Sequence, residues 1–402
     1  MFRCCKASEP DGKRPQKRQL MTPALTQPVM IDDDAELARC CDQWRRLPFV
    51  AVDTEFVRTE TFYPIAGLIQ IGDGERATLI DPLGIGDWTP FVALLEDASV
   101  VKVLHACSED LEVFSRLCGA LPAPLFDTQL AAAFLGMDFS MGYSRLVSAL
   151  LDIDLPKDET RSDWLQRPLS PAQIEYAARD AQHLAELYQI LAPRIAQAGV
   201  AEWLFADTAE QVAASGQMIE PEQAYLQVKQ AWRLKPAELA ILRPLAAWRE
   251  RESRARDIAR NRLLRERTLV PLAQRQPDTL QALSRIEDMH PRTVRHEGET
   301  ILQLIREGRA VAPSDYPEVL PEPLPSAANR LLKALRKVGQ DEAEKRGIAV
   351  EIMLRKKVLE AMVRTGYPSG PYRLPDELTG WRRELMGEAL LKAANGAVEV
   401  AE

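Results

Sequence analysis

The chain contains 402 residues, of which 46% are hydrophobic and 27% are charged, and its formal net charge is −8. This composition is typical of a soluble globular protein, and the length predicts two or three domains. No apolar run approaches the roughly 18–20 residues of a membrane span, so we expect no membrane partner. The negative charge argues mildly against nucleic-acid binding, but only as an average over a chain whose charge is unevenly distributed.

Residues 1–28 are basic and rich in proline, and they contain no apolar stretch that would form a signal peptide. We expect them to be a disordered basic tail, with Met21 or Met30 as an alternative start. The six cysteines occur as Cys4-Cys5, Cys40-Cys41, Cys107 and Cys118, and none forms a CxxC pair. This arrangement favours reduced thiols in a cytoplasmic protein over a disulfide framework or a zinc site.

The segment after this tail is predicted to begin with a helix and a set of strands. Residues 32–47 have acidic residues at the start and arginines near the end, which matches the helix dipole. Four strand-like runs follow, at residues 49–53, 67–72, 77–81 and 100–106. The glycine-containing turn between the second and third runs predicts that the first three strands form an antiparallel meander.

Three helical segments complete this first domain. Residues 108–119 are expected to form a helix that Gly119 closes, and residues 128–151 have a helical pattern throughout. Residues 170–191 form a long amphipathic helix, with Ser170 as its cap and a proline in the first turn. Mixed strands with helices on both faces predict an α/β domain over residues 29–215.

The strand pattern disappears beyond about residue 222. Residues 226–312 and 326–396 are expected to form two small all-α domains with a similar rhythm, joined by a Pro-rich linker at residues 313–325. Lys229–Arg309 contains 18 Lys and Arg against 11 Asp and Glu, a net charge of +7. Glutamates spaced three or four residues from these arginines also fit a solvated, salt-bridged helix. The excess of positive charge favours a phosphate-binding face.

Acidic side chains occur at three places where burial would be costly. Asp53 and Glu55 end the first strand and project from one face, roughly 6–7 Å apart at a rise of about 3.3 Å per residue. Asp110 begins the helix after the fourth strand, and Tyr176 and Asp180 share one face of the long helix. That helix face is otherwise apolar and should pack on the sheet. The four carboxylates are therefore predicted to meet at one end of the sheet.

Four carboxylates in a small volume repel one another unless cations lie between them. Ligation by oxygen alone suits Mg²⁺ or Mn²⁺, whereas Zn²⁺ would require Cys or His ligands that this set lacks. Two such ions about 4 Å apart would clamp the attacking and leaving oxygens of a phosphodiester. Tyr176, one turn from Asp180, would orient the attacking water or help to deprotonate it. The spacing thus predicts a metal-dependent phosphodiester site.

The motifs that carry these residues, VDTEF, HACSEDLEVF and YAARD, resemble the three motifs of the DEDD exonuclease superfamily, in the branch with Tyr in the third motif. The resemblance implies a ribonuclease H-like mixed sheet flanked by helices, and two divalent cations as cofactors. It also implies that four carboxylates are metal ligands and that these and one tyrosine are catalytic: Asp53, Glu55, Asp110, Asp180 and Tyr176.

A DEDD domain followed by a basic helical module resembles the ribonuclease D family, in which one or two HRDC-type domains follow the exonuclease domain. The resemblance implies a 3′–5′ exoribonuclease that releases 5′-mononucleotides and matures the 3′ ends of tRNA precursors and other small structured RNAs. The expected partner is a single-stranded RNA 3′ end, and the expected state is a monomer in the cytoplasm. A 3′–5′ DNA exonuclease and an inactive RNA-binding scaffold are the alternatives, although the intact acids argue against the scaffold.

Other polar residues near the motifs have two interpretations. Glu109 and Glu112 are better interpreted as acids that the helix dipole stabilises near the start of the helix than as metal ligands. Asp127 fits a helix N-cap, and it is the alternative to Asp110 as a ligand. Arg161 fits a surface arginine or a phosphate contact.

The candidates for substrate contact are Thr54, Phe56, Gln70 and His105. Phe56 would stack on a terminal base or pack in the core. Gln70 would face the nucleotide or a polar patch of the sheet. His105 would reach the scissile phosphate or lie buried with a bond to the backbone.

Overall fold

The computed structural model describes residues 28–155 and 162–399. The predicted tail, apart from its last residue, and Arg161 lie outside these described residues. The strands are β1 (Val29–Ile31), β2 (Phe49–Val57), β3 (Ile65–Gly72), β4 (Ala77–Ile80), β5 (Val101–Leu104) and β6 (Leu125–Asp127). The helices up to the end of the first domain are α1 (Asp34–Trp44), α2 (Thr89–Leu95), α3 (Ser108–Cys118), α4 (Thr128–Phe134), α5 (Tyr143–Leu151), α6 (Pro171–Gln197) and α7 (Ala201–Ser215).

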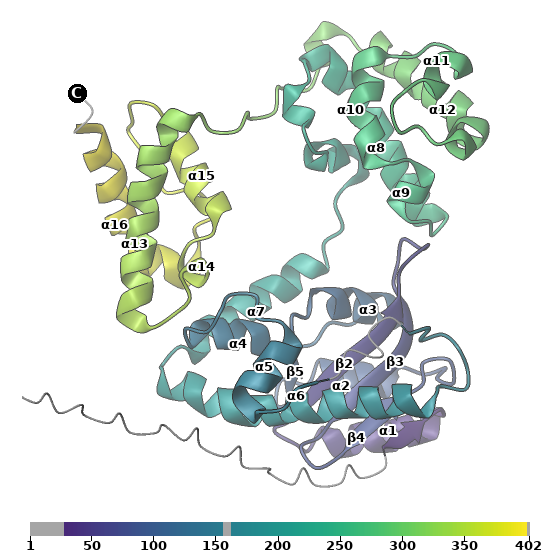
Figure 1. The fold of residues 1–402 in the computed structure, drawn as a ribbon, viewed down its shortest axis with the longest axis vertical. Coiled ribbons are helices and arrows are strands. Elements are labelled where there is room, and N and C mark those ends of the chain that lie inside the picture. The colour runs from purple at the N-terminus through teal and green to yellow at the C-terminus, as the bar shows by residue number, and fades with distance from the viewer. Residues whose placement is uncertain (1–27, 156–161, 400–402) are drawn as a thin grey trace, which may run out of the picture.

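Two helical modules follow this α/β part (Figure 1). The first helical module, residues 221–310, contains η1 (Pro221–Gln227), η2 (Ala231–Arg233), α8 (Pro236–Ala255), α9 (Arg260–Leu263), α10 (Glu266–Arg275), α11 (Leu280–Ser284) and α12 (Pro291–Ala310). The second helical module, residues 329–399, contains α13 (Asn329–Arg346), α14 (Val350–Met353), α15 (Lys356–Arg364) and α16 (Gly380–Glu399). Between them lie η3 (Pro313–Asp315) and η4 (Ser326–Ala328).

The described strands form one six-stranded mixed sheet with the order β1-β4-β3-β2-β5-β6. β2, β3 and β4 pair antiparallel as the predicted meander, whereas β1, β5 and β6 join it in parallel pairs. The sequence did not reveal β1 and β6, because three residues are too few to show an alternating pattern. The predicted fold class, a mixed sheet flanked by helices and followed by helical domains, is confirmed.

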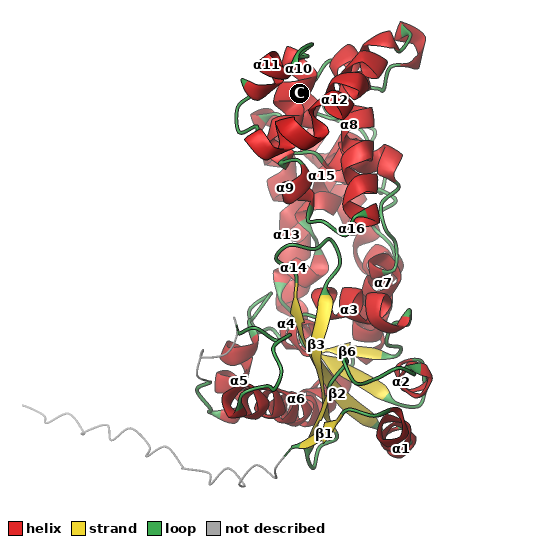
Figure 2. Cartoon of the chain, turned by 90° about the vertical axis from the view of Figure 1, so that its right-hand side faces the viewer, coloured by secondary structure: helices red, strands yellow, loops and turns green. Residues whose placement is uncertain are grey.

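Helices cover both faces of the sheet (Figure 2). On one face, α1, α2 and α3 bury side chains such as Trp44, Phe91 and Phe114 against the inner residues of β2 and β5. On the other face, α6 lies along the strands and buries Ala181 and Leu184. The alternation of β2 sends Asp53 and Glu55 toward the α6 face, so the acids emerge beside a helix and not in open solvent.

The long helix α6 is fixed at its start by local sequence. The Ser170 hydroxyl accepts a hydrogen bond from the Gln173 N–H, and the Gln173 side chain accepts one from the Ser170 N–H. This capping box satisfies two N–H groups that a helix start leaves unpaired. A Cβ on Gly72 would lie 2.3 Å from the Ala181 carbonyl oxygen, so only glycine permits α6 to lie this close to β3.

The predicted helical segment 128–151 is divided into two helices. Gly136 has a φ of +74°, and the N–H groups of Gly136 and Met137 donate to Ala133 and Ala132. This is the Schellman pattern, in which a left-handed glycine terminates a helix. The helical pattern predicted over residues 128–151 was wrong between these two helices, because the apolar periodicity of α4 and α5 outweighed the two glycines that separate them, Gly136 and Gly142.

The two helical modules share an order of elements. In each, a long helix (α8 or α13) precedes a four-residue helix (α9 or α14), a shorter helix (α10 or α15) and a 20-residue helix (α12 or α16). In each, the residue before the four-residue helix donates its N–H to a carbonyl of the α/β domain: Ala259 to Glu60 and Ala349 to Ala133. The shared order of elements indicates that the two modules are a degenerate repeat, in line with their similar rhythm in the sequence.

The second helical module packs on the α/β domain through one continuous apolar core. The rings of Trp203 and Trp381 stack with centroids 4.5 Å apart and an interplanar angle of 7°. Beside them, Arg382 forms two hydrogen bonds to the buried Asp207 carboxylate, at 2.6 and 2.5 Å. Because burial of apolar surface contributes about 25 cal/mol per Å², this shared apolar core stabilises the attachment of the second helical module.

The free cysteines of the described chain are Cys40, Cys41, Cys107 and Cys118, in agreement with the prediction of reduced thiols. Burial raises the pKa of Cys107, which keeps this thiol protonated. Among residues 28–155 and 162–399, no helix combines the length and apolar character that a membrane crossing needs.

Candidate active site

A cavity of about 210 Å³ opens beside the acidic part of β2. It is lined by residues from β2, from the end of β5, and from α5 and α6: Asp53, Thr54, Glu55, His105, Tyr143, Tyr176, Asp180 and Leu184. None of these lining residues is Lys or Arg. The cavity therefore concentrates negative charge without a Lys or Arg side chain on its wall to neutralise it.

Three of the four predicted carboxylates converge in this cavity. One oxygen from each of Asp53, Glu55 and Asp180 lies within 4.8 Å of the others. β2 supplies the first two because its alternation places residues 53 and 55 on one face. The helix α6, which packs on the same face of the sheet, supplies the third carboxylate, Asp180, as the spacing of the long helix predicted.

Asp110 lies next to this cluster but outside it. It is buried in the first turn of α3, where its Oδ1 accepts a 2.5 Å hydrogen bond from the Thr54 hydroxyl. Thr54 stands between Asp53 and Glu55 on β2 and points to the opposite face. Burial and the charge of Asp53 raise the pKa of Asp110, so the two carboxyl groups interact although the Thr54 hydroxyl holds Asp110 to one side.

Burial and mutual repulsion raise the pKa values throughout the cluster. Burial raises the pKa of Asp53, and burial together with the charge of Asp53 raises the pKa of Glu55. The same two causes raise the pKa of Asp180 to about 7. Carboxyl groups in this state bind protons when no counter-charge is present, and bound cations replace those protons.

Tyr176 lies one turn before Asp180 on α6, and its hydroxyl interacts with the Asp180 carboxylate. Its ring faces that of the buried Trp164, with centroids 6.0 Å apart. Trp164 belongs to the segment before α6, which Arg167 anchors with 2.5 and 2.6 Å hydrogen bonds to Asp81. The orientation of the tyrosine is thus set by packing as well as by its helix.

Tyr143 is a site residue that the sequence analysis missed. Its hydroxyl donates a 2.5 Å hydrogen bond to the carbonyl oxygen of Asp180, and its ring packs edge-on against His105 at 5.3 Å. It lies at the start of α5, far from the three motifs in sequence. The local sequence GYSRL carries no signal beyond the glycine that precedes a helix.

The alternatives for Asp127 and His105 have clear structural outcomes. Asp127 caps α4 by accepting from the N–H groups of Gln129 and Leu130, which confirms the N-cap interpretation. The His105 Nδ1 hydrogen-bonds to the Thr128 hydroxyl at 2.9 Å, and burial lowers the pKa of the ring. Its Nε2 is buried and has no hydrogen-bond partner among the described residues. His105 therefore presents one unused ring nitrogen near the acidic cavity.

The four candidate substrate contacts separate into two pairs. Thr54 and His105 line the cavity, whereas Phe56 and Gln70 do not. Gln70 pairs with Asp53 across β2 and β3 and is fully buried, and neither atom of its amide group has a partner within the described chain. Phe56 follows a register shift in β2 and is half-buried.

The residues present fit hard divalent cations. The converging donors are carboxylate oxygens, which Mg²⁺ and Mn²⁺ prefer, and no Lys or Arg lines the cavity into which they project. A mixed sheet that brings such acids together beneath a tyrosine defines a metal-dependent nuclease of the DEDD type.

Comparison with known proteins agrees with this class. A family model described as a 3′–5′ exonuclease matches residues 28–196, and an HRDC domain model matches residues 238–305. The chain is 60% identical to ribonuclease D of Pseudomonas paraeruginosa, over 91% of this chain and 97% of that protein. It is 39% identical to ribonuclease D of Escherichia coli, over 90% of this chain and 96% of that protein.

A solved structure shows the same relationship. The crystal structure of Escherichia coli RNase D, described as an exoribonuclease involved in structured RNA processing, superposes with a TM-score of 0.85 at 36% identity. The superposition covers 92% of this chain and 99% of that one. The chain belongs to the ribonuclease D family. It is a metal-dependent 3′–5′ exoribonuclease, and its substrate is RNA.

Proposed function

We propose that the protein removes 5′-mononucleotides one at a time from single-stranded 3′ ends of RNA, with two Mg²⁺ or Mn²⁺ ions held by Asp53, Glu55, Asp110 and Asp180. The observation that carries this proposal is the convergence of three carboxylates within 4.8 Å in a cavity whose lining contains no Lys or Arg. Asp110 would be the fourth ligand. It lies next to the three converging carboxylates, where it accepts a hydrogen bond from the Thr54 hydroxyl.

When bound, divalent cations supply the positive charge that stabilises a phosphodiester under attack. The side chains of the protein itself position the reacting groups. Tyr176 orients the attacking water with its hydroxyl, which the Asp180 carboxylate and the Trp164 ring hold in place. His105 directs its free Nε2 at the scissile phosphate, and Tyr143 fixes the helix turn that carries Asp180.

The proposed substrates are RNAs whose 3′ ends extend beyond a folded part, such as tRNA precursors. Escherichia coli RNase D, described as acting in structured RNA processing, supports this choice. The net positive charge of Lys229–Arg309 supports a substrate that extends beyond the acidic cavity. We further propose that the enzyme works as a monomer in the cytoplasm, with helical domains at residues 226–312 and 326–396.

A digestion series tests this proposal. The purified chain is incubated with a 3′-extended tRNA, an unstructured RNA and a DNA strand of the same sequence, each with Mg²⁺ or with EDTA. We expect 5′-mononucleotides from both RNAs, a digestion that stops near the mature end of the tRNA, and no product in EDTA. Faster hydrolysis of DNA would favour the DNA exonuclease, and no hydrolysis of any strand would favour the inactive scaffold.

Replacing Tyr176 with Phe should lower kcat by about 10²-fold, because the variant keeps the ring but loses the hydroxyl that orients the water. KM should change little, since the phenol hydroxyl contacts Asp180 and not the upstream RNA. Steady-state hydrolysis of a labelled RNA measures kcat and KM, and a titration with Mn²⁺ measures metal binding. A variant with wild-type kcat, or one that no longer binds Mn²⁺, would contradict this role.

A further inference from the structure

The loop between β2 and β3 leaves the sheet and docks on the first helical module. The N–H groups of Phe62 and Tyr63 donate to one oxygen of Asp257, at 3.0 and 2.9 Å. The Ala259 N–H donates to the Glu60 carbonyl at 2.8 Å. The Phe62 ring is buried beneath the Arg260 guanidinium, 4.4 Å from its centroid. These contacts fix the first helical module to the strand that carries the catalytic acids.

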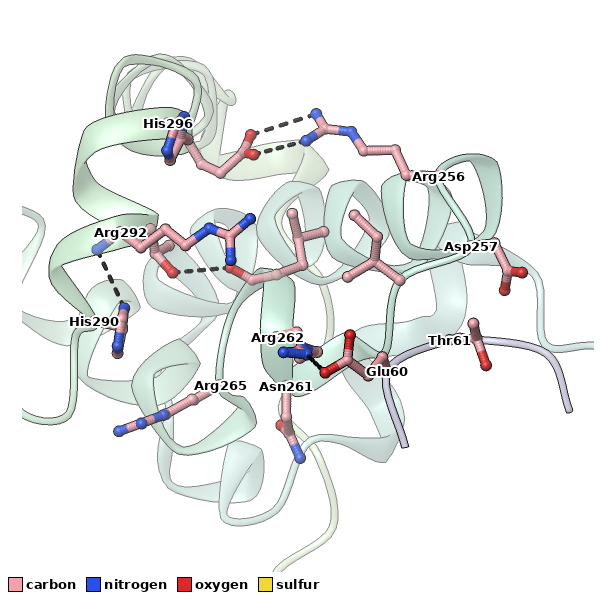
Figure 3. Close-up of a pocket in the computed structure, with 14 residues that line it drawn as sticks. Glu60, Thr61, Arg256, Asp257, Asn261, Arg262, Arg265, His290, Arg292 and His296 are labelled. Atoms are coloured by element: carbon pink, nitrogen blue, oxygen red, sulfur yellow. Dashed lines mark hydrogen bonds and ion pairs between the residues drawn. The ribbon is translucent and has the colours of Figure 1, made fainter. Parts of the chain in front are cut away.

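A cleft of about 740 Å³ lies beside this docking point (Figure 3). Glu60 and Thr61 of the exonuclease domain form one edge, and the region around α9 together with the first turns of α12 forms the rest. We call it the interdomain cleft. Its basic side chains come from separate segments: Arg256, Arg262, Arg265, His290, Arg292 and His296.

The acids of the interdomain cleft are already engaged, which leaves positive charge in excess. Glu297 pairs with Arg256 at 2.7 Å, and Glu60 pairs with Arg262 at 2.6 Å. Asp257, the third acid, accepts the backbone bonds of the docking loop.

Two arginines of the cleft have no such partner. Among the described residues, no carboxylate pairs with Arg265 or Arg292. The exposed His290 and His296 lie near Arg292 (Figure 3). A cleft with unneutralised guanidinium groups is suited to anionic phosphates, which arginine binds with two donors at once.

The cleft continues into a second hollow of the first helical module. That hollow has a volume of about 670 Å³ and shares Asn261 and Arg265 with the interdomain cleft. It adds Lys229 and Arg267 to the basic surface. Arg265 thus stands where the two hollows meet, and together they form a groove in which Lys and Arg outnumber the acids even when Glu266 of the second hollow is included.

The groove is close to the active site along the chain. Glu60 follows Glu55 by five residues, and a chain that rises about 3.3 Å per residue spans at most roughly 17 Å in that distance. The docking loop then prevents the module from moving away from β2. A strand with its 3′ end at Glu55 therefore needs only a few nucleotides to reach the cleft.

The corresponding place in the second helical module differs in charge. Arg355 precedes α15 as Arg265 precedes α10, and it lines a cleft of about 490 Å³ against the exonuclease domain. That cleft also contains Asp127, Asp207 and Glu210. Even with Asp207 neutralised by Arg382, Asp127 and Glu210 outnumber the single arginine of this lining, so the path along the first helical module has the more suitable charge.

We propose that the interdomain cleft binds consecutive backbone phosphates of the RNA a few nucleotides upstream of the 3′ end, with Arg265 and Arg292 as the principal contacts. This assignment rests on the proposed function, since it names where the same substrate is held. The Glu60–Arg262 ion pair also lies in the interdomain cleft. Both side chains are largely exposed, so the pair contributes little and a phosphate can replace the carboxylate.

The full-length double variant Arg265→Glu/Arg292→Glu tests the proposal, with Arg295→Glu as the matched control. Arg295 is exposed on α12, one turn from Arg292, and does not line the cleft. Binding of a fluorescein-labelled 15-nucleotide single-stranded RNA is measured by anisotropy in EDTA over a range of salt. We expect affinity at 0.15 M salt to fall at least about tenfold, and the slope of log K against log salt to flatten by about 1.4, because two phosphate contacts are lost.

Glu60→Gln provides a test in the opposite direction. This change removes a negative charge from the cleft and frees Arg262, while the Glu60 carbonyl keeps its bond to Ala259. RNA binding should become several-fold tighter and more sensitive to salt. If the side chain served only to hold the domains together, binding would weaken, and that result would overturn the proposal.

The remaining outcomes are separable. Hydrolysis of a dinucleotide, which is too short to reach the cleft, shows that the active centre of each preparation works. If the wild type hydrolyses RNA but the double variant binds the 15-mer as Arg295→Glu does, the cleft assignment fails and the proposed function stands. If the wild type hydrolyses no RNA, the proposed function itself fails.

Discussion

Replacing Asp53 with Asn should lower the rate of RNA hydrolysis by at least about 10³-fold, equivalent to about 4 kcal/mol of transition-state stabilisation. Asp53 is central because its charge acts on the pKa values of Glu55, Asp110 and Asp180. Asparagine keeps the shape of the side chain but removes one anionic donor. The expected loss is therefore one of cation binding and not of folding.

Stability measurements separate these two explanations. In EDTA, the Asp53→Asn variant should unfold at the same temperature as the wild type or higher, because one repelling carboxylate has been removed. Glu109→Gln is the matched control, since Glu109 is exposed in the same turn of α3 as Asp110 and does not line the cavity. The control should retain full single-turnover activity. Activity of Asp53→Asn within tenfold of the wild type would remove Asp53 from the ligand set.

Replacing Asp207 with Ala should destabilise the protein by about 3 kcal/mol and release the second helical module. Asp207 is buried and accepts two hydrogen bonds from Arg382 and one from the Trp381 indole. Its removal leaves the largely buried Arg382 guanidinium without a carboxylate, and an unpaired buried charge costs about 3–5 kcal/mol. Thermal unfolding and proteolysis of the segment between α12 and α13 would report the change.

Two further variants decide whether the unpaired charge is the cause. Glu210→Ala removes an exposed acid that accepts a long hydrogen bond of 3.4 Å from the Thr379 hydroxyl, and it should change stability little. The double variant Asp207→Ala/Arg382→Met removes both charges and should recover part of the loss. If Asp207→Ala unfolds like the wild type, this ion pair does not hold the module to the exonuclease domain.

The parts of the site that the sequence predicted depend on local geometry. A strand sends Asp53 and Glu55 to one face, and a helix does the same for Tyr176 and Asp180, so their spacing is informative without the fold. The structure brings Asp53, Glu55 and Asp180 together. The ligand role of Asp110 stays a prediction, since its oxygen is bound to a threonine that no spacing rule identifies.

The parts that the sequence did not reveal depend on contacts between distant segments. Tyr143 reaches the Asp180 backbone across 37 residues, and Asp257 meets the docking loop across almost 200. Neither contact leaves a periodic pattern at either end. The break at Gly136 was missed for a different reason, because one left-handed glycine is a weak signal between two apolar helices.

The central claim is that the carboxylates beside β2 exist together because divalent cations neutralise them. The most direct measurement is anomalous scattering from a crystal of the wild-type protein soaked in Mn²⁺. We expect strong peaks within coordination distance of Asp53, Glu55 and Asp180, with one of these peaks shared by Asp110. A well-ordered site without a peak beside these oxygens would contradict it.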